Sequence, residues 1–245
     1  MIGIPIELHP SFPSDVGVIL LTESAKSDPN VIASLKAQLE AGKTVVITSG
    51  LLHALEGKGI EDLVELRTGM HAEVPSFTGA FGPGPGTALG AATKPILLPQ
   101  IRFPTNEAWP VVRGIADNKA FPVLLMDQYS RGKLLVLTIP DNFLRICTKR
   151  PAPALNAIRS YIVGDFPVRI EAPAQVSLFA YDNGAFIVES FRDQPADITI
   201  LESQGSTLTN LASGAHPTPL PSVKPAQPTV GPHLSADRVK LEAHS

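Results

Sequence analysis

Apolar residues in the first part of the chain follow the pattern of a strand, a helix and a second strand. Residues 16–21 form an almost continuous apolar run and residues 44–48 form a β-branched run, as expected for strands covered on both faces. Between these runs, Ile32, Leu35 and Leu39 recur at helical spacing. A crossover helix between two buried strands predicts a right-handed parallel βαβ unit, and therefore an α/β fold.

The ends of this predicted helix are marked by residues with special backbone preferences. Asp28 is expected to cap the N-terminus, because Pro29 follows it at the first helical position, where a missing N–H costs nothing. Gly42 is expected to end the helix in a left-handed conformation. Thr-Ser-Gly at residues 48–50 ends the second strand, and residues 51–55 predict a short helix after it.

Further strands are predicted up to residue 139, with one irregular stretch among them. Residues 74–93 contain Gly-Pro-Gly-Pro-Gly at 82–86, which predicts a loop or an excursion at a sheet edge. The last two strands should form a hairpin around a turn at residues 130–133. The predicted strands cover residues 2–8, 94–103, 111–115, 121–127 and 134–139.

The second half of the chain changes from helical spacing to strict alternation. Residues 153–163 predict a helix, and from Pro167 onward apolar and polar residues alternate as in antiparallel strands. Asp-Asn-Gly at residues 182–184 lies between two alternating runs and is a strong hairpin signal. Six prolines after Gly214 predict an extended, poorly ordered tail.

These patterns together predict a fold class and three segments. Residues 1–164 should form an α/β domain with a parallel sheet, and residues 165–214 a small antiparallel β-sandwich. Residues 215–245 should form a proline-rich disordered tail.

Composition and charge exclude several classes of partner. The chain has 245 residues and a net charge of -3, which argues against nucleic acid or an anionic membrane as the main partner. Cys147 is the single cysteine, so neither an internal disulfide nor a thiolate metal cluster can form. The pattern of apolar and polar residues does not explain the basic segment from Arg145 to Arg150 that surrounds this cysteine. No apolar stretch is long enough for a membrane span, and the N-terminus carries no recognisable secretion signal.

The N-terminus allows two interpretations. Met1 lies where an α/β unit would normally be under way, so it can correspond to an internal methionine of a longer ancestral chain. The alternative is an ordinary short edge strand. A chain that begins within a fold would expose one flank of its sheet and favour a homo-oligomer.

Several short motifs resemble a region of bacterial glycoside hydrolases. Asp28, Leu35, Ala-Gly-Lys at 41–43 and Thr-Ser-Gly at 48–50 resemble the amidotransferase-like, or flavodoxin-like, domain that follows the catalytic barrel in family 42 β-galactosidases. Residues 129–137 resemble a hairpin of that domain. Residues 176–191 resemble the small C-terminal β-sandwich that follows.

The resemblance implies a fold without the chemistry of its relatives. In that family the catalytic carboxylates belong to the barrel, which this chain lacks, so no catalytic residue carries over. Amidotransferases of this fold use a cysteine at a strand-to-helix elbow, whereas Cys147 lies in a basic segment. The resemblance therefore implies an accessory module for oligomerisation or domain support.

The residues themselves suggest an alternative, a stand-alone hydrolase of small esters or lactones. Ser49 ends a parallel strand, where ligands of α/β sheets bind, and His53 follows one helical turn later. Asp141 or Glu23 could orient the imidazole. Only half of the G-x-S-x-G elbow is present, so the competing interpretation is that Ser49 caps the next helix and His53 is a surface or interface residue.

Two weaker binding sites are also considered. Trp109 and Tyr129 could stack on a carbohydrate ring, although a single tryptophan followed by a proline more often belongs to the core. Acidic and amide groups near the predicted hairpin could hold calcium, although their spacing matches no loop motif and ordinary turn chemistry explains them. No other cofactor is predicted. The four residues of the possible calcium site are Asp182, Asn183, Glu189 and Asp193.

Overall fold

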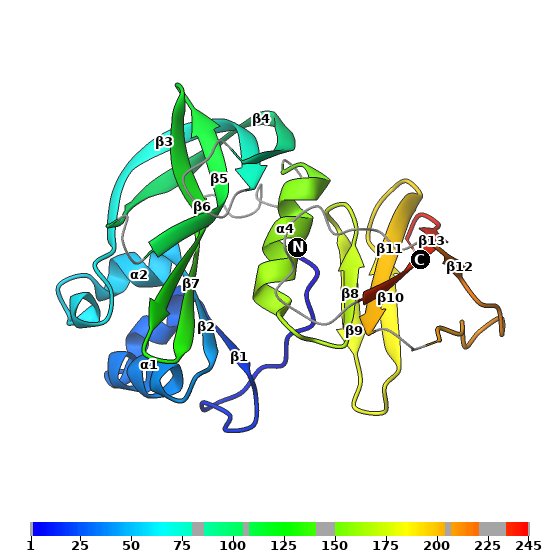
Figure 1. Cartoon of the computed structure of the whole chain (residues 1–245), viewed down its shortest axis with the longest axis horizontal. Helices are drawn as coiled ribbons and strands as arrows, with labels where there is room; N and C mark the ends of the chain where they lie inside the picture. Colours follow the sequence, from blue (N-terminus) through cyan, green and yellow to red (C-terminus); the bar gives the residue numbers. More distant parts are fainter. Residues whose placement is uncertain are drawn as a thin grey trace. The chain divides into compact units, whose positions relative to one another are not determined.

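The computed structural model describes residues 2–79, 86–104, 108–140, 150–203, 207–220 and 234–244. It divides the chain into two compact units, which Figure 1 shows with the strand and helix labels used below. The sheet unit comprises Leu8–Ala154, and the sandwich unit comprises Met1–Glu7 together with Leu155–Ser245. This division differs from the predicted boundary after residue 164, because the helix before that boundary and the first residues of the chain belong to the sandwich unit.

The sheet unit is built on one mixed sheet of seven strands, ordered β1-β2-β7-β6-β5-β3-β4. Strands β1, β2 and β7 pair in parallel, whereas β7 to β6, β6 to β5, β5 to β3 and β3 to β4 are antiparallel. The α/β fold class is therefore correct, but the predicted parallel sheet is limited to three strands. The strands are β1 Val18–Leu21, β2 Thr44–Thr48, β3 Arg67–Gly79, β4 Thr87–Arg102, β5 Ala108–Ala116, β6 Lys119–Tyr129 and β7 Gly132–Leu137.

The predicted βαβ unit is confirmed. Helix α1 (Val31–Glu40) connects β1 to β2 and packs on the sheet through Leu35 and Leu39, which are fully buried. Gly42 has a φ of +87° and ends the helix as expected. The short helix α2 (Ser49–Leu55) follows β2, and single turns of 3-10 helix occupy Glu23–Ser27 (η1) and Ile60–Asp62 (η2).

The predicted cap of α1 is wrong by two residues. The helix begins at Val31 with Asn30 as its N-cap residue. Asp28 Oδ1 instead accepts a hydrogen bond of 2.8 Å from the backbone N–H of Asn30. Asp28 therefore stabilises the turn that leads into the helix, because Asp side chains readily bond to the backbone two residues later.

For residues 74–93 the sequence left two alternatives, a loop or an excursion at a sheet edge, and the structure supports the second. Most of this stretch belongs to β3 and β4, two long antiparallel strands; residues 80–85 lie outside the described part of the chain. Strand β4 is an edge strand, and the ladder between β3 and β4 shifts register around Pro75. Prolines are tolerated at such edges and irregularities, which is why a local pattern rich in Pro and Gly did not predict strands here.

The sandwich unit consists of two small antiparallel sheets that share a core. One sheet pairs β9 with β10, and the other has the order β12-β13-β11-β8. Val176, Leu178, Ile198 and Ile200 from both sheets are buried in a common cluster, so the predicted β-sandwich is confirmed. Helix α4 (Ala152–Val163) also agrees with the prediction. The strands are β8 Val168–Glu171, β9 Val176–Ala180, β10 Phe186–Ser190, β11 Ala196–Ser203, β12 Thr218–Pro219 and β13 Leu234–Leu241.

The structure of this unit differs from the predictions for both ends of the chain. Within the predicted disordered tail, residues 234–241 form β13, which pairs along its whole length with β11. At the other end, residues 2–8 form no strand. Gly3 takes a left-handed φ of +75° and accepts a hydrogen bond of 3.3 Å from the N–H of Leu178, so this segment packs on the sandwich unit in extended form.

Candidate functional site

The first candidate site lies where β2 ends, at Ser49. The Ser49 hydroxyl accepts a hydrogen bond of 3.0 Å from the N–H of Ile139 and lies 3.3 Å from the carbonyl oxygen of the same residue, to which it donates. Ser49 is only 2% exposed. Thr48, not Ser49, caps α2, because its Oγ1 accepts from the N–H of Leu51 at 3.3 Å. Ser49 thus joins the ends of two neighbouring parallel strands, β2 and β7.

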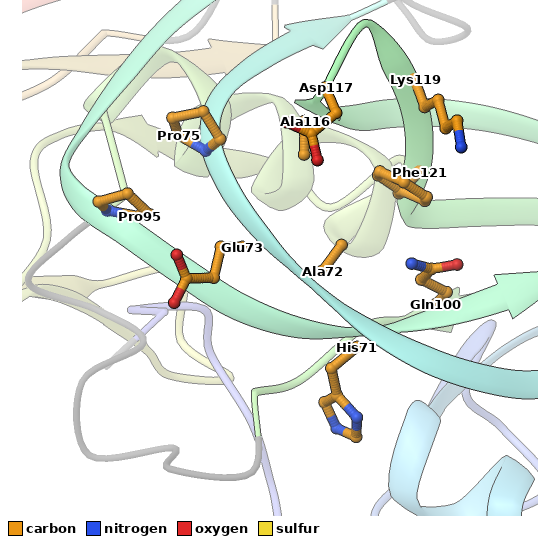
Figure 2. Close-up of a pocket in the computed structure, with 10 residues that line it drawn as sticks. All are labelled: His71, Ala72, Glu73, Pro75, Pro95, Gln100, Ala116, Asp117, Lys119 and Phe121. Carbon is orange, nitrogen blue, oxygen red and sulfur yellow. The ribbon is translucent and has the colours of Figure 1, made fainter.

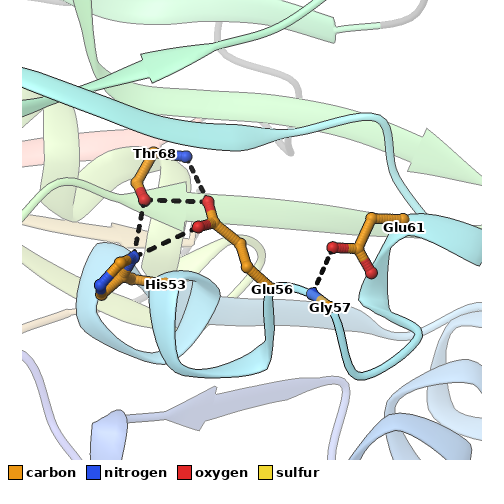
Figure 3. Close-up of polar contacts among 5 residues, drawn as sticks. All are labelled: His53, Glu56, Gly57, Glu61 and Thr68. Atoms are coloured by element: carbon orange, nitrogen blue, oxygen red, sulfur yellow. Dashed lines mark hydrogen bonds and ion pairs between the residues drawn. The ribbon is translucent and has the colours of Figure 1, made fainter.

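His53 takes part in a different set of hydrogen bonds, at the start of β3. Its Nδ1 lies 2.9 Å from Oγ1 of Thr68 and 3.3 Å from Oε2 of Glu56. The other oxygen of Glu56 accepts from both the N–H and the hydroxyl of Thr68 (Figure 3). The His53 side chain is 73% exposed. These contacts attach the end of α2 to β3, and they direct His53 to partners other than Ser49.

Two carboxylates, Asp141 and Glu23, could orient His53 in a catalytic triad. Asp141 lies outside the described residues. Glu23 lies against the start of α2, since a Cβ on Gly50 would come within 2.9 Å of its Oε2. Lys26 donates to Glu23 Oε1 at 2.7 Å and, as the main cause, lowers the pKa of that carboxyl below its usual range. Glu23 therefore forms an exposed ion pair with Lys26.

The polar loop that follows α2 is held by a further carboxylate. Glu61 Oε1 accepts a hydrogen bond of 2.6 Å from the N–H of Gly57, and this bond lowers the pKa of Glu61 (Figure 3). The arrangement closes the turn between α2 and η2. It is an exposed structural contact and brings no nucleophile into reach.

Trp109 and Tyr129 lie on opposite faces of the sheet. Trp109 on β5 is paired with Met126 on β6, and paired residues project to the same face. Tyr129 follows three residues after Met126 in a regular stretch of β6, so it projects to the other face. There it packs against the core formed with α1 and α2. The two aromatic rings do not form one stacking surface.

Two of the four residues considered for calcium, Asn183 and Asp193, have hydrogen-bond partners in the protein. Asn183 Oδ1 accepts from the N–H of Ala185 at 3.0 Å, and Gly184 has a φ of +79°, as expected for the predicted hairpin. Asp193 Oδ1 lies 3.0 Å from Nε2 of His244. In the described part of the chain, no three His, Cys, Asp or Glu side chains are grouped closely enough to hold a metal ion.

The basic segment is described only at its end. Cys147 lies among residues 141–149, outside the described residues. Arg150 is buried, and its Nη2 donates a hydrogen bond of 2.9 Å to the carbonyl oxygen of Thr138 just beyond β7. Arg150 therefore helps to hold the chain after the last strand of the sheet unit.

Sequence reasoning missed a pocket of about 530 Å³ between β3, β4 and the β5–β6 hairpin. In Figure 2, Gln100, Asp117, Lys119 and Phe121 are grouped on one side of β3, and Glu73 lies on its other side. The signal that could have found the pocket is the pair of prolines at 75 and 95, which face each other where the ladder between β3 and β4 shifts register. The lining residues are His71, Ala72, Glu73, Pro75, Pro95, Gln100, Ala116, Asp117, Lys119 and Phe121.

Comparison with known families gives two matches along the chain. Residues 1–142 match the family described as the second domain of the uncharacterized protein SSO3021. Residues 167–245 match the family described as the C-terminal domain of a probable glycosyl hydrolase. The resemblance of part of this chain to glycoside hydrolases, predicted from its motifs, is thereby confirmed. No curated protein matches the chain by sequence.

Solved structures with a similar arrangement include glycoside hydrolases. The β-galactosidase from Rahnella sp. R3 has a TM-score of 0.44 and 13% identity, over 94% of this chain and 31% of that one. Gan42B, a GH42 β-galactosidase from G. stearothermophilus, has a TM-score of 0.42 and 10% identity, again over 94% and 31%. The chain therefore spans about a third of the length of these enzymes. In the part of the chain that the structure describes, no helix is both long and apolar enough to cross a membrane.

Proposed function

We propose that this chain, which belongs through residues 1–142 to the family of the second domain of the uncharacterized protein SSO3021, is an accessory module. The module is derived from a glycoside hydrolase, forms no catalytic barrel in its described residues, and supports a neighbouring domain or an oligomer. The observation that carries this proposal is the match of residues 167–245 to a C-terminal domain of a probable glycosyl hydrolase.

The architecture of the sheet unit supports an amidotransferase-like origin. Its parallel part contains the β1-α1-β2 crossover and continues to β7, and such parallel βαβ units are also the building blocks of flavodoxin-like domains. The antiparallel strands β3 to β6 extend this part. Ser49, at the carboxyl edge where such folds bind ligands, bonds to the backbone of Ile139 instead.

An exposed apolar face on the sandwich unit supports a role in assembly. Phe179 and Ile187 are directly paired across β9 and β10 and are 42% and 51% exposed. Tyr181 and Phe191, at the ends of these strands, are also exposed. The opposite face of the hairpin packs in the core of the unit. Exposed apolar side chains that cluster on one face, as the paired Phe179 and Ile187 do, can mark a surface that contacts another protein.

Assembly through this face is tested by analytical ultracentrifugation of the purified chain over a range of concentrations. We expect the wild-type chain to self-associate, and the double variant Phe179→Ser, Ile187→Ser to remain monomeric with an unchanged circular dichroism spectrum. The control is Leu211→Ser, which removes an exposed apolar side chain outside the hairpin. A wild-type chain that is monomeric at all concentrations would leave only the support of a neighbouring domain.

The alternative function, hydrolysis of small esters or lactones, is tested by a substrate screen. Nitrophenyl esters, lactones and nitrophenyl glycosides are offered to the wild-type chain and to Ser49→Ala. We expect no turnover above background on any class. Ester or lactone hydrolysis that disappears in Ser49→Ala would replace the accessory role with a hydrolase.

A further inference from the structure

The pocket of the sheet unit exists because β3 separates from its neighbours at one proline. Val74 pairs with Ile96 and Ser76 pairs with Ala91, so Pro75 alone faces residues 92–95 of β4. Towards β5, strand β3 forms its ladder only over residues 76–79. Proline cannot donate to a ladder, so the strands part at Pro75 and leave space between them. The lining of this space includes the small side chains of two alanines, Ala72 and Ala116.

One wall of the pocket is held rigidly by a tight turn. Strands β5 and β6 are joined by Asp117 and Asn118, with φ values of 49° and 59°, between the paired residues Ala116 and Lys119. A two-residue turn with two left-handed residues matches the twist of the flanking strands and is a common hairpin connection. The turn therefore fixes the backbone that carries Asp117 and Lys119, whose side chains are exposed.

The chemistry of the lining combines three kinds of group. Asp117 and Glu73 offer carboxylate oxygens, Lys119 offers an ammonium group, and the Gln100 amide both donates and accepts. Phe121 adds the face of a half-buried ring. A ligand that contacts Gln100, Asp117 and Lys119 together with Phe121 is best matched by hydroxyl groups, which donate and accept, around a ring with an apolar face.

We propose that this pocket binds a neutral carbohydrate, with one ring placed against Phe121 and its hydroxyl groups bonded to Asp117, Lys119 and Gln100. Its volume of about 530 Å³ can hold a mono- or disaccharide. An anionic sugar is disfavoured because two carboxylates line the pocket against one lysine. This inference goes beyond the proposed function, because an accessory module needs no small ligand, and it concerns a site away from Ser49.

The proposal is tested by a titration of the isotope-labelled full chain followed by two-dimensional amide NMR. The probes are lactose, cellobiose, galactose and galacturonate. We expect saturable shifts at residues 71–73, 100 and 116–121 with a neutral sugar, and much weaker shifts with galacturonate. Asp117→Ala should weaken binding about tenfold, because it removes one charged hydrogen-bond acceptor.

Two further variants make the result specific. Phe121→Leu keeps an apolar side chain but removes the aromatic face, and should also weaken binding. Phe179→Leu changes an exposed aromatic residue of the sandwich unit and should leave binding unchanged. The absence of saturable shifts with every neutral sugar would overturn the proposal, as would equal affinity in Asp117→Ala or tighter binding of galacturonate. None of these outcomes affects the accessory role, which is tested by ultracentrifugation and the substrate screen.

Discussion

The guanidinium group of Arg159 donates a hydrogen bond of 2.6 Å from Nε to the carbonyl oxygen of Ile2, 157 residues earlier in the chain. Arg159 is only 3% exposed. The same guanidinium donates to the carbonyl oxygens of Ala172, Pro173 and Val176. One buried side chain thus holds the beginning of the chain and the segment before β9 together within the sandwich unit.

Replacing Arg159 by leucine should therefore destabilise the chain strongly. The change leaves several buried carbonyl oxygens without donors, and we expect a loss of about 3 kcal/mol or more in the free energy of unfolding. Urea unfolding measures this loss. The control is Arg238→Leu on an exposed position of β13, which should change stability by less than about 0.5 kcal/mol. Equal effects of the two changes would contradict the anchoring role.

Gly3 should not tolerate a side chain. A Cβ at this position would lie 2.0 Å from the carbonyl oxygen of Val176, and the φ of +75° is itself unfavourable for other residues. We expect Gly3→Ala to cost about 2 kcal/mol or more, measured by urea unfolding. Gly17→Ala is the matched control, because a Cβ on Gly17 meets nothing within 4 Å. A harmless Gly3→Ala would show that the N-terminal segment does not pack as described.

Ser49→Ala should lower stability as well as test for activity. The Ile139 N–H loses its acceptor in a site where the serine is almost fully buried. An unsatisfied buried N–H costs about 1–3 kcal/mol, so the melting temperature should fall by several degrees. Ser24→Ala, at an exposed position of η1, should leave it unchanged. An unaltered melting temperature in Ser49→Ala would favour a hydroxyl kept for chemistry.

Glu202 should make the stability of the chain depend on pH. Burial raises the pKa of Glu202, and nearby Asp237 raises it further, while the hydroxyl of Ser235 donates to Glu202 Oε1 at 3.2 Å and opposes the shift. A carboxyl whose pKa is higher in the folded state contributes stability at low pH, and this contribution is lost as the pH rises through that folded pKa. Ionising Glu202 therefore costs stability.

The variant Glu202→Gln isolates this effect, because glutamine mimics the neutral acid. We expect its stability relative to the wild-type chain to increase with pH above the ordinary pKa of glutamate, about 4.3. Urea unfolding at a series of pH values measures the difference. Glu65→Gln, at an exposed position, should show no such trend. A difference between Glu202→Gln and wild type that is independent of pH would contradict the prediction.

Local sequence patterns correctly predicted the helices and strands whose formation depends mainly on their own residues. The β1-α1-β2 unit followed from two apolar runs around a helical stripe, and the hairpins followed from turn residues such as Asn183 and Gly184. The same reasoning left a loop as an alternative where proline interrupts the pattern. Pro75 lies inside β3, because the irregular ladder with β4 accommodates a residue that donates no hydrogen bond.

At the candidate sites too, the sequence predicted the local element but not the contacts with distant residues. The sequence correctly placed Ser49 at the end of a strand and His53 on the helix after it. Their bonding partners lie far away in the sequence: Ile139, just beyond β7, for Ser49 and Thr68, in β3, for His53. The residues around the serine and the histidine therefore do not predict these partners. The pocket was missed for a related reason, since its lining comes from three separate parts of the sheet.

The sequence by itself determined the α/β class, two of the hairpins, the main helices and the resemblance to glycoside hydrolases, because periodicity and turn chemistry act over a few neighbouring residues. Tertiary structure alone decided that β13 completes the sheet next to β11 and that Gly3 packs beside Val176. It also decided that Ser49 bonds to Ile139. These choices rest on backbone hydrogen bonds and close packing between distant segments, which form only when the whole chain has folded.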